Sequence, residues 1–271
     1  MTSCFSRRAL ISHIRLKDSN MYRLAFTSVT FRKLSREEIC IAAKENGIEY
    51  IEWGGDIHLP PDDENALAEV IFLQKKYGIK AISYGSYYRI GQRDYELFGK
   101  ILSVSEKIGC RRIRLWLGTV SSEKTDEKLF ESLVEETQKL CDMAKEKDIT
   151  LSFEFHEGTF NDNGKSSLGF LRAVNRENIA TYWQPLRVKA DFDNLRAVAP
   201  HVNGVHVFYW DKLGIRYGLK KGADEWEKYI SLLKTESKNT DYILEFVKGD
   251  SVIQFAKDVS AVKDILDSVY G

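Results

Sequence analysis

The feature that most constrains the fold of this chain is a regular alternation of short β-rich runs with longer amphipathic ones. Runs rich in apolar and β-branched residues predict eight strands, at 22–29, 48–53, 79–84, 111–117, 149–155, 179–183, 203–209 and 241–247. Runs with a helical spacing of apolar residues follow each of them, at 35–46, 62–77, 92–108, 125–147, 166–175, 191–199, 224–236 and 251–269. Such an alternation predicts parallel strands joined by helical crossovers.

The predicted helix ends support this repeating unit. Ser35 is followed three residues later by Glu38, which is the pattern of a capping box at a helix start. Gly47, Gly78 and Gly109 each end a predicted helix at intervals of 31 residues, where a helix C-terminus favours positive φ. Eight such units predict an α/β fold, a single-domain (β/α)8 TIM barrel. A doubly wound open sheet is the alternative, but FTSVTFRKLS follows the first strand in place of a glycine-rich phosphate loop.

The N-terminal segment differs from the rest of the chain. Residues 1–20 have no clear periodicity, and their apolar stretch is too short for a signal peptide. We therefore expect 1–20 to be an extension outside the fold and 21–271 to be the catalytic barrel domain. A basic arm with a role of its own is the alternative interpretation.

Charge and cysteine content narrow the functional classes. The 271 residues carry 40 basic and 40 acidic side chains, which argues against a nucleic-acid partner because phosphate binding needs a basic surplus. No apolar run is long enough to span a membrane. The cysteines are scattered without a CxxC pair, which predicts buried thiols in a cytoplasmic protein, and they are Cys4, Cys40, Cys110 and Cys141.

Four polar side chains stand on consecutive predicted strands near the ends where a barrel carries its function. They are Glu154, Gln184, His206 and Glu245. A carboxylate among buried apolar residues is costly unless it is paired or bound to a cation. Taken singly, each is more often an ion-pair partner or a satisfied core residue. Together, two carboxylates, an imidazole and an amide oxygen predict a site for a divalent metal ion such as Mn2+, Mg2+, Co2+ or Zn2+.

Short motifs around these residues resemble a known family. The runs EFHEGTFND at 154–162, YWQP at 182–185, HVF at 206–208 and ILE at 243–245 are similar to the xylose-isomerase-like barrel superfamily. Within it the chain resembles isomerases and epimerases of sugars or sugar phosphates, including ketose 3-epimerases, over about residues 22–270. The superfamily also contains endonuclease IV-type DNA repair enzymes and inosose dehydratases.

The resemblance implies a metal site and a reaction. It implies that Glu154, His206 and Glu245 bind the metal, with Gln184 at the position where the epimerases usually have aspartate. The substitution leaves two negative charges for a divalent ion and predicts weaker binding, and a glutamine also fits a metal-free relative. The implied chemistry is proton transfer next to a sugar carbonyl through an enediolate. Glu154 and Glu245 are then the catalytic pair, one removing the proton and the other returning it on the opposite face.

Three function classes follow. The first is a metal-dependent sugar isomerase or epimerase of carbohydrate metabolism, with a small-molecule sugar as its partner. The second is a polyol lyase or dehydratase, or a repair enzyme, although five histidines are few for a trinuclear zinc site. The third is a non-catalytic sugar-binding barrel. The chain is compatible with a homo-oligomer in each case.

Substrate contacts are predicted from residues near the expected barrel mouth. The candidates for substrate binding are His156, Arg187, Lys212, His58 and Trp53. A surface charge or a structural residue explains each of them as well. Trp116 and Trp183 are further candidates for stacking on a sugar. Arg114 and Trp116 alternate on one strand, so both can point inward, where Arg114 would neutralise Glu52 or contact a phosphate.

Overall fold

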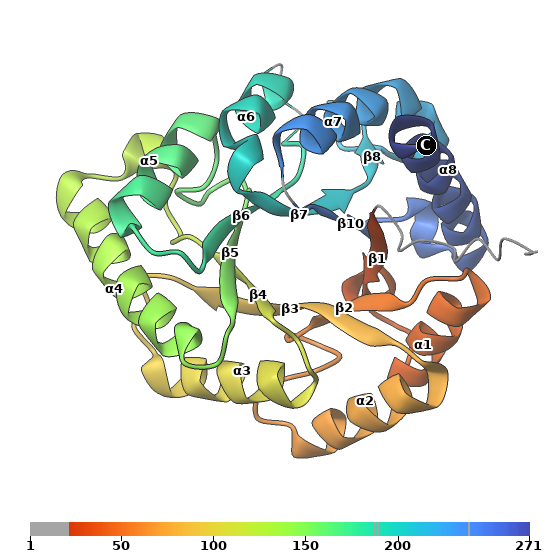
Figure 1. Ribbon diagram of the computed structural model, residues 1–271, viewed down its shortest axis with the longest axis horizontal. Coiled ribbons are helices and arrows are strands. Elements are labelled where there is room, and N and C mark those ends of the chain that lie inside the picture. The colour runs from red at the N-terminus through yellow and green to blue at the C-terminus, as the bar shows by residue number, and fades with distance from the viewer. Residues whose placement is uncertain (1–21, 187, 189, 238) are drawn as a thin grey trace, which may run out of the picture.

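Eight parallel strands of the described chain pair into a closed barrel, in the order β1-β10-β7-β6-β5-β4-β3-β2 (Figure 1). The structure is a computed structural model that describes residues 22–186, 188, 190–237 and 239–271. The barrel strands are β1 (Arg23–Thr27), β2 (Tyr50–Gly54), β3 (Lys80–Arg89), β4 (Arg112–Trp116), β5 (Thr150–Glu154), β6 (Ile179–Trp183), β7 (Val202–Val207) and β10 (Asp241–Leu244). This closed topology confirms the (β/α)8 barrel and excludes the open sheet.

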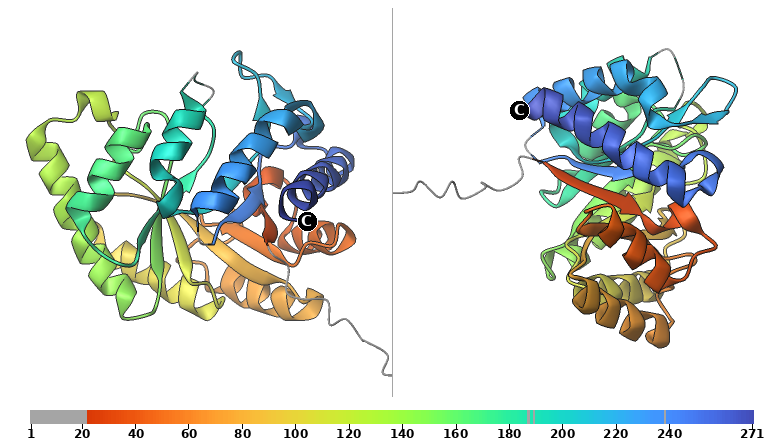
Figure 2. Two further views of the ribbon diagram at one scale, coloured as in Figure 1. Left: turned by 45° about the horizontal axis from the view of Figure 1, so that its top comes forward. Right: turned by 90° about the vertical axis from the view of Figure 1, so that its right-hand side faces the viewer.

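Helices surround the barrel, one after each strand, as Figures 1 and 2 show. They are α1 (Arg36–Glu45), α2 (Glu64–Tyr77), α3 (Tyr95–Lys107), α4 (Glu127–Lys145), α5 (Gly164–Val174), α6 (Asp191–Val198), α7 (Ala223–Glu236) and α8 (Val252–Tyr270). Each predicted element overlaps an observed one. The sequence did not predict the hairpin of β8 (Tyr209–Trp210) and β9 (Arg216–Tyr217), nor the continuation of β3 to Arg89.

The helix ends form as their sequences predict. The side chain of Ser35 accepts from the amide of Glu38, and the carboxylate of Glu38 accepts from the amide of Ser35 at 2.7 Å, so the capping box is confirmed. Gly47, Gly78 and Gly109 have φ of 63°, 68° and 72°, a conformation that costs a residue with a Cβ atom energy. The capping box and the glycines thus set where these helices begin or end and where the chain enters the next strand.

The main core lies between the strands and the helices. Trp53, Trp183 and Trp226 belong to it and are fully buried. Cys40, Cys110 and Cys141 are buried free thiols, as expected, whereas Cys4 lies outside the described residues.

A second, smaller cluster fills the middle of the barrel itself and consists of Ala25, Ile82, Tyr182 and Ile243. This apolar layer separates the two ends of the barrel. The polar side chains at the opening formed by the C-terminal strand ends therefore form a different environment from those at the other end.

Gly204 makes room for the ring of Tyr182, and this close packing gives a testable prediction. A Cβ atom on Gly204 would lie 2.3 Å from Cε2 of Tyr182. We expect Gly204→Ala to lower the free energy of unfolding by about 1–3 kcal/mol, because a crowded core has to move side chains or backbone. Gly169→Ala in α5 is the control, since its Cβ would meet nothing within 4 Å. Chemical denaturation measures both, and equal stability of the two variants would contradict the packing argument.

Residues 1–20, expected to form an extension, lie outside the described residues, so that expectation stays a prediction. Among the helices of the described chain, none combines the length and apolar character needed to cross a bilayer.

Candidate active site and metal centre

The four residues predicted to share a metal stand at one end of the barrel. Glu154 is the last residue of β5, and Gln184 and Glu245 directly follow β6 and β10. His206 precedes the last residue of β7. All four side chains are buried, with residue exposures between 0% and 6%. Parallel strands of a barrel bring their C-terminal ends to the same opening, and so four distant parts of the sequence meet there.

His206 is held between carboxylates on both sides of its ring. Its Nε2 lies 3.2 Å from Oε1 of Glu52, and its Nδ1 lies 3.3 Å from Glu154 and 3.2 Å from Glu245. When Nε2 carries the proton toward Glu52, the lone pair of Nδ1 faces the other two carboxylates. A second carboxylate that orients a histidine in this way is typical of metal sites in proteins.

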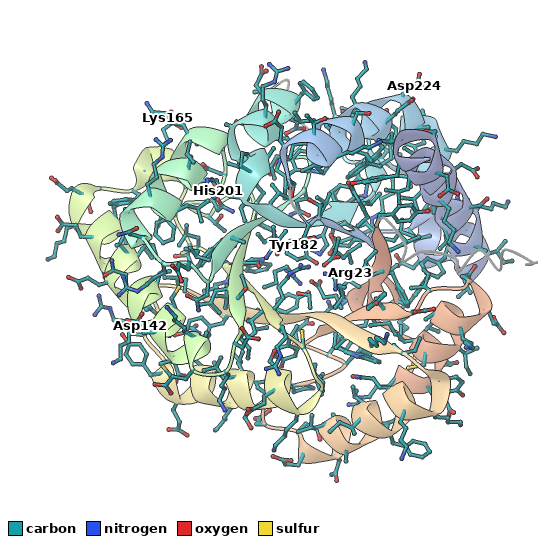
Figure 3. All side chains as sticks on the ribbon, in the orientation of Figure 1. Arg23, Asp142, Lys165, Tyr182, His201 and Asp224 are labelled. Carbon is teal, nitrogen blue, oxygen red and sulfur yellow. The ribbon has the colours of Figure 1, made fainter. Side chains whose placement is uncertain are left out.

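Glu52 is fixed in turn by two further contacts. The hydroxyl of Tyr182 donates to Oε2 of Glu52 at 2.8 Å, and Nε of Arg114 donates to its Oε1 at 3.2 Å. Burial raises the pKa of Glu52, but the positive charges of Arg114 and His206 outweigh it and hold that pKa below its ordinary value. Glu52 therefore stays ionised beneath the site. Figure 3 labels Tyr182 inside the ring of strands, in contrast to Asp142 and Lys165 on the surrounding helices.

Glu154 is the carboxylate with the most donors. Nη1 of Arg114 and the indole nitrogen of Trp116 both donate to its Oε2, and Nε2 of Gln184 donates to its Oε1 at 3.1 Å. Burial raises the pKa of Glu154, but the charge of Arg114 and the contact with His206 lower it to about 2. Glu154 is thus a permanently charged group with one oxygen, Oε1, directed toward His206.

Glu245 has the opposite character. Its Oε2 is buried and has no hydrogen-bond partner among the described residues. Burial, together with the negative charge of Glu154, raises the pKa of Glu245 to about 7, although His206 opposes this. Burial lowers the pKa of His206, but the charges of Glu245 and Glu52 raise it to about 10. The carboxylates around His206 therefore stabilise a positive charge at this position, either a proton or a bound cation.

The donor set fits a divalent cation. One ligand atom from each of Glu154, His206 and Glu245 lies within 4.8 Å of the other two. Nδ1 of His206, Oε2 of Glu245 and Oε1 of Gln184 are buried without a hydrogen-bond partner in the described chain. Once His206 gives up its proton to bind a metal, three carboxylates against the single guanidinium of Arg114 leave two negative charges, which a divalent cation would balance. Oxygen and nitrogen ligands of this kind suit Mg2+, Mn2+ or Zn2+.

A cavity of about 720 Å3 opens above these residues. Glu154, Gln184 and Glu245 form part of its floor, and His206 lies buried below. Its lining also includes the aromatic residues Phe31, Tyr87, Trp116, Phe208, Trp210 and Phe246. Tyr87 and Phe246 have φ of 59° and 52°, an uncommon conformation for bulky residues. Phe246 directly follows Glu245, so this turn helps to set the position of that carboxylate.

Two residues predicted to contact substrate belong to the structural framework instead. Trp53 points away from the barrel interior and is fully buried in the core against the helices, because Glu52 takes the inward position on β2. His58 is buried, with Nδ1 3.0 Å from Oγ of Ser28 and Nε2 3.1 Å from the carbonyl of Leu34. Neither residue lines the cavity. Trp183 is likewise in the core, 4.9 Å from Tyr229 between ring centroids.

The remaining predicted contacts have different outcomes. His156 lines the cavity and packs against Trp116, with 4.8 Å between ring centroids.

Lys212 is exposed and does not line the cavity. Asp211 closes a tight turn at this position by accepting from the amides of Leu213 and Ile215. That turn places Lys212 at the tip of the β8–β9 hairpin, and the cation that reaches the cavity from this hairpin is Arg216. Arg187 lies outside the described residues.

The contact of Arg114 with Glu52 agrees with the sequence-based prediction, whereas two other contacts of the site were not predicted. The pairing of Arg114 with Glu154 depends on the stagger between strands, since Arg114 pairs with Ser152 in the barrel register. The role of Tyr182 was overlooked, although it stands two residues before Gln184 and therefore faces the same side of β6.

Comparison with known proteins agrees with this architecture. Residues 40–256 match the family model described as xylose isomerase-like TIM barrel. No curated protein matches the sequence significantly.

Solved structures with the same fold include three with different descriptions. A probable 3-DHS dehydratase, AsbF of Bacillus anthracis, has a TM-score of 0.76 at 15% identity over 89% of this chain and 98% of its own. A xylose isomerase-like TIM barrel protein of Mycobacterium smegmatis in complex with magnesium has a TM-score of 0.73 at 14% identity, over 93% and 98%. D-psicose 3-epimerase of Clostridium cellulolyticum H10, in complex with D-tagatose, has a TM-score of 0.70 at 12% identity, over 91% and 99%.

Proposed function

The chain belongs to the xylose isomerase-like TIM barrel family, and we propose that it is a divalent-metal-dependent isomerase or epimerase of a sugar or sugar derivative. The observation that carries this proposal is the meeting of Glu154, His206 and Glu245 below the 720 Å3 cavity, with unpartnered ligand atoms directed at one another. The magnesium-bound and epimerase structures of the same fold are consistent with it.

The residues that would hold the cation are Glu154, His206 and Glu245, with Gln184 as a fourth ligand through its unpartnered Oε1. A bound divalent cation would polarise a substrate carbonyl and make the neighbouring C–H more acidic. Glu52 would keep His206 in the tautomer whose Nδ1 is free to bind, because it accepts from Nε2. Arg114 would offset part of the negative charge and hold Glu154 in place.

Glu245 is the better placed of the two glutamates to move a proton. It lines the cavity and its Oε2 has no donor in the described chain, whereas three side chains donate to Glu154. In the isomerase reaction Glu245 would take the proton from the hydroxyl-bearing carbon next to the carbonyl and return it to the former carbonyl carbon, while the hydroxyl hydrogen passes to the former carbonyl oxygen. In an epimerase, Glu154 would have to deliver a proton to the opposite face of the same carbon. For this, one of the hydrogen bonds that Glu154 accepts would have to break.

The difference between Glu245, which is free to move a proton, and Glu154, which accepts from three donors, favours a dehydratase as the second candidate. Elimination of water next to a carbonyl needs one base to remove the α-proton and one acid to protonate the departing hydroxyl. Glu245 could do both in turn, while Glu154 keeps its three donors. A structure with this fold is described as a probable 3-DHS dehydratase.

Incubation of the protein in D2O with Mn2+ tests the proposal. The substrates are fructose, psicose, tagatose and 3-DHS, followed by NMR and mass spectrometry. We expect deuterium at a carbon next to a carbonyl for at least one compound, together with an isomer or a product lighter by one water. An isomer supports the first candidate and loss of water supports the second. No exchange with any compound, with Mn2+ bound, would favour the non-catalytic sugar-binding barrel.

A further inference from the structure

A second cavity lies at the opposite end of the barrel from the candidate active site and has a volume of about 460 Å3. Its lining includes Arg23, Tyr50, Lys80, Arg112 and Thr150, which are the first residues of β1, β2, β3, β4 and β5. In Figure 3, Arg23 is labelled beside the barrel strands rather than on an outer helix. The N-terminal ends of barrel strands usually serve stability, so the chemistry of this cavity is not explained by the reaction proposed above.

The cavity is strongly cationic. Arg23, Lys80, Arg111 and Arg112 line it, and no acidic residue does so in the described part of the chain. The nearest buried carboxylate, Asp241, is already bonded: Nε of Arg23 donates to it at 2.6 Å and Nη2 of Arg112 at 2.7 Å. Lys80 and Arg111 form no salt bridge with any described residue. Positive charge therefore remains without a partner around the cavity.

Part of this charge is buried, on Arg112. Its side chain is only 9% exposed, yet Nε and Nη1 are buried without a hydrogen-bond partner in the described chain. Its guanidinium carbon lies 5.9 Å from the ring centroid of Tyr182. Buried, unpaired donors of a charged group are costly, and an anion that reached either nitrogen would offset part of that cost.

Neutral polar groups complete the lining. Oδ1 of Asn203 accepts from the hydroxyl of Ser152 at 3.0 Å, which leaves the amide nitrogen of Asn203 as a donor. Oε1 of Gln74 is buried without a partner and would accept from a hydroxyl group. The volume exceeds what a single inorganic ion fills and lies in the range of small-molecule sites.

We propose that this cavity binds a phosphorylated, hydroxyl-bearing small molecule, with the phosphate held by Arg112, Lys80 and Arg111. Arg112 supplies a buried charged donor to the cavity, and Lys80 and Arg111 add further positive charge to its lining. The site is separated from the catalytic end by the apolar layer of Ala25, Ile82, Tyr182 and Ile243. It is thus a ligand site in its own right and does not depend on the reaction at the other end.

Calorimetric titration with ribose 5-phosphate, with ribose as the uncharged comparison, tests this proposal on the full chain. We expect ribose 5-phosphate to bind with one site per chain and ribose to bind at least tenfold more weakly. Lys80→Ala/Arg111→Ala should weaken ribose 5-phosphate binding by tenfold or more. Arg112→Lys should also weaken it, because lysine keeps the charge beside Asp241 but lacks the two unpartnered guanidinium nitrogens.

Lys44→Ala/Lys257→Ala is the control, since it removes two exposed cations of α1 and α8 that do not line the cavity. Unchanged binding in the control and weakened binding in the cavity variants supports the site. If wild-type protein does not bind ribose 5-phosphate, or binds it as tightly when Lys80 and Arg111 are replaced, the proposal is wrong. An equal loss in the control would show general charge attraction and would also overturn it.

Discussion

Glu245→Gln is expected to reduce solvent deuterium exchange into the substrate by about 100-fold or more while the fold stays intact. The amide is similar in size to the carboxylate and keeps an oxygen that can face a cation. It cannot take a proton from carbon, which is the role that the Glu245 carboxylate would perform at the cavity. The measurement is the initial rate of deuterium incorporation by NMR at saturating Mn2+, so that weaker metal binding does not mimic the loss.

Glu157→Gln provides the matched control. Glu157 also lines the cavity but is exposed at its rim, so the same change of charge is made at the same opening. We expect this variant to keep most of the wild-type rate. Retention of more than about a tenth of the rate by Glu245→Gln would refute its role as the base. An equal fall in both variants would point to a general charge effect.

Arg114→Met is expected to produce the largest loss of stability at the site. Arg114 is buried and contacts Glu52 and Glu154 together, so its removal leaves two buried carboxylates without their cationic partner. Removing one partner of a buried ion pair typically costs about 3–5 kcal/mol, because the remaining charge is uncompensated. Urea denaturation of the metal-free protein would measure this loss, with methionine filling most of the space of the arginine stem.

Arg172→Met serves as the comparison, because Arg172 is exposed on α5 and its substitution should change the free energy of unfolding by about 0.5 kcal/mol or less. A loss for Arg114→Met as small as that for Arg172→Met would mean that the carboxylates do not depend on Arg114. The charge balance on which the metal site is argued would then be wrong.

The barrel and its four central side chains could be predicted because both depend on short-range patterns. Alternating runs, the capping box at Ser35 and the positive-φ glycines are local, and the structure reproduces them. The meeting of Glu154, Gln184, His206 and Glu245 follows once the strands close, because polar residues at the ends of buried parallel strands share one opening.

The rest of the site depends on geometry that the sequence does not display. Trp53 was assigned to the pocket because it ends a strand, but the two-residue period of β2 directs Glu52 inward and Trp53 outward. Lys212 does not reach the cavity and Arg216 does, because the turn that Asp211 closes is not visible in the sequence pattern. The contact of Arg114 with Glu154 depends on how neighbouring strands are staggered around the barrel, which no short-range pattern encodes.

A crystal soaked with Mn2+ and measured for anomalous scattering is the most direct test of the central claim. The proposed function predicts one strong peak per chain at the C-terminal end of the barrel, about 2.0–2.5 Å from ligand atoms of Glu154, His206 and Glu245. A peak elsewhere, or none at this site with Arg114 and water satisfying the carboxylates, would contradict it.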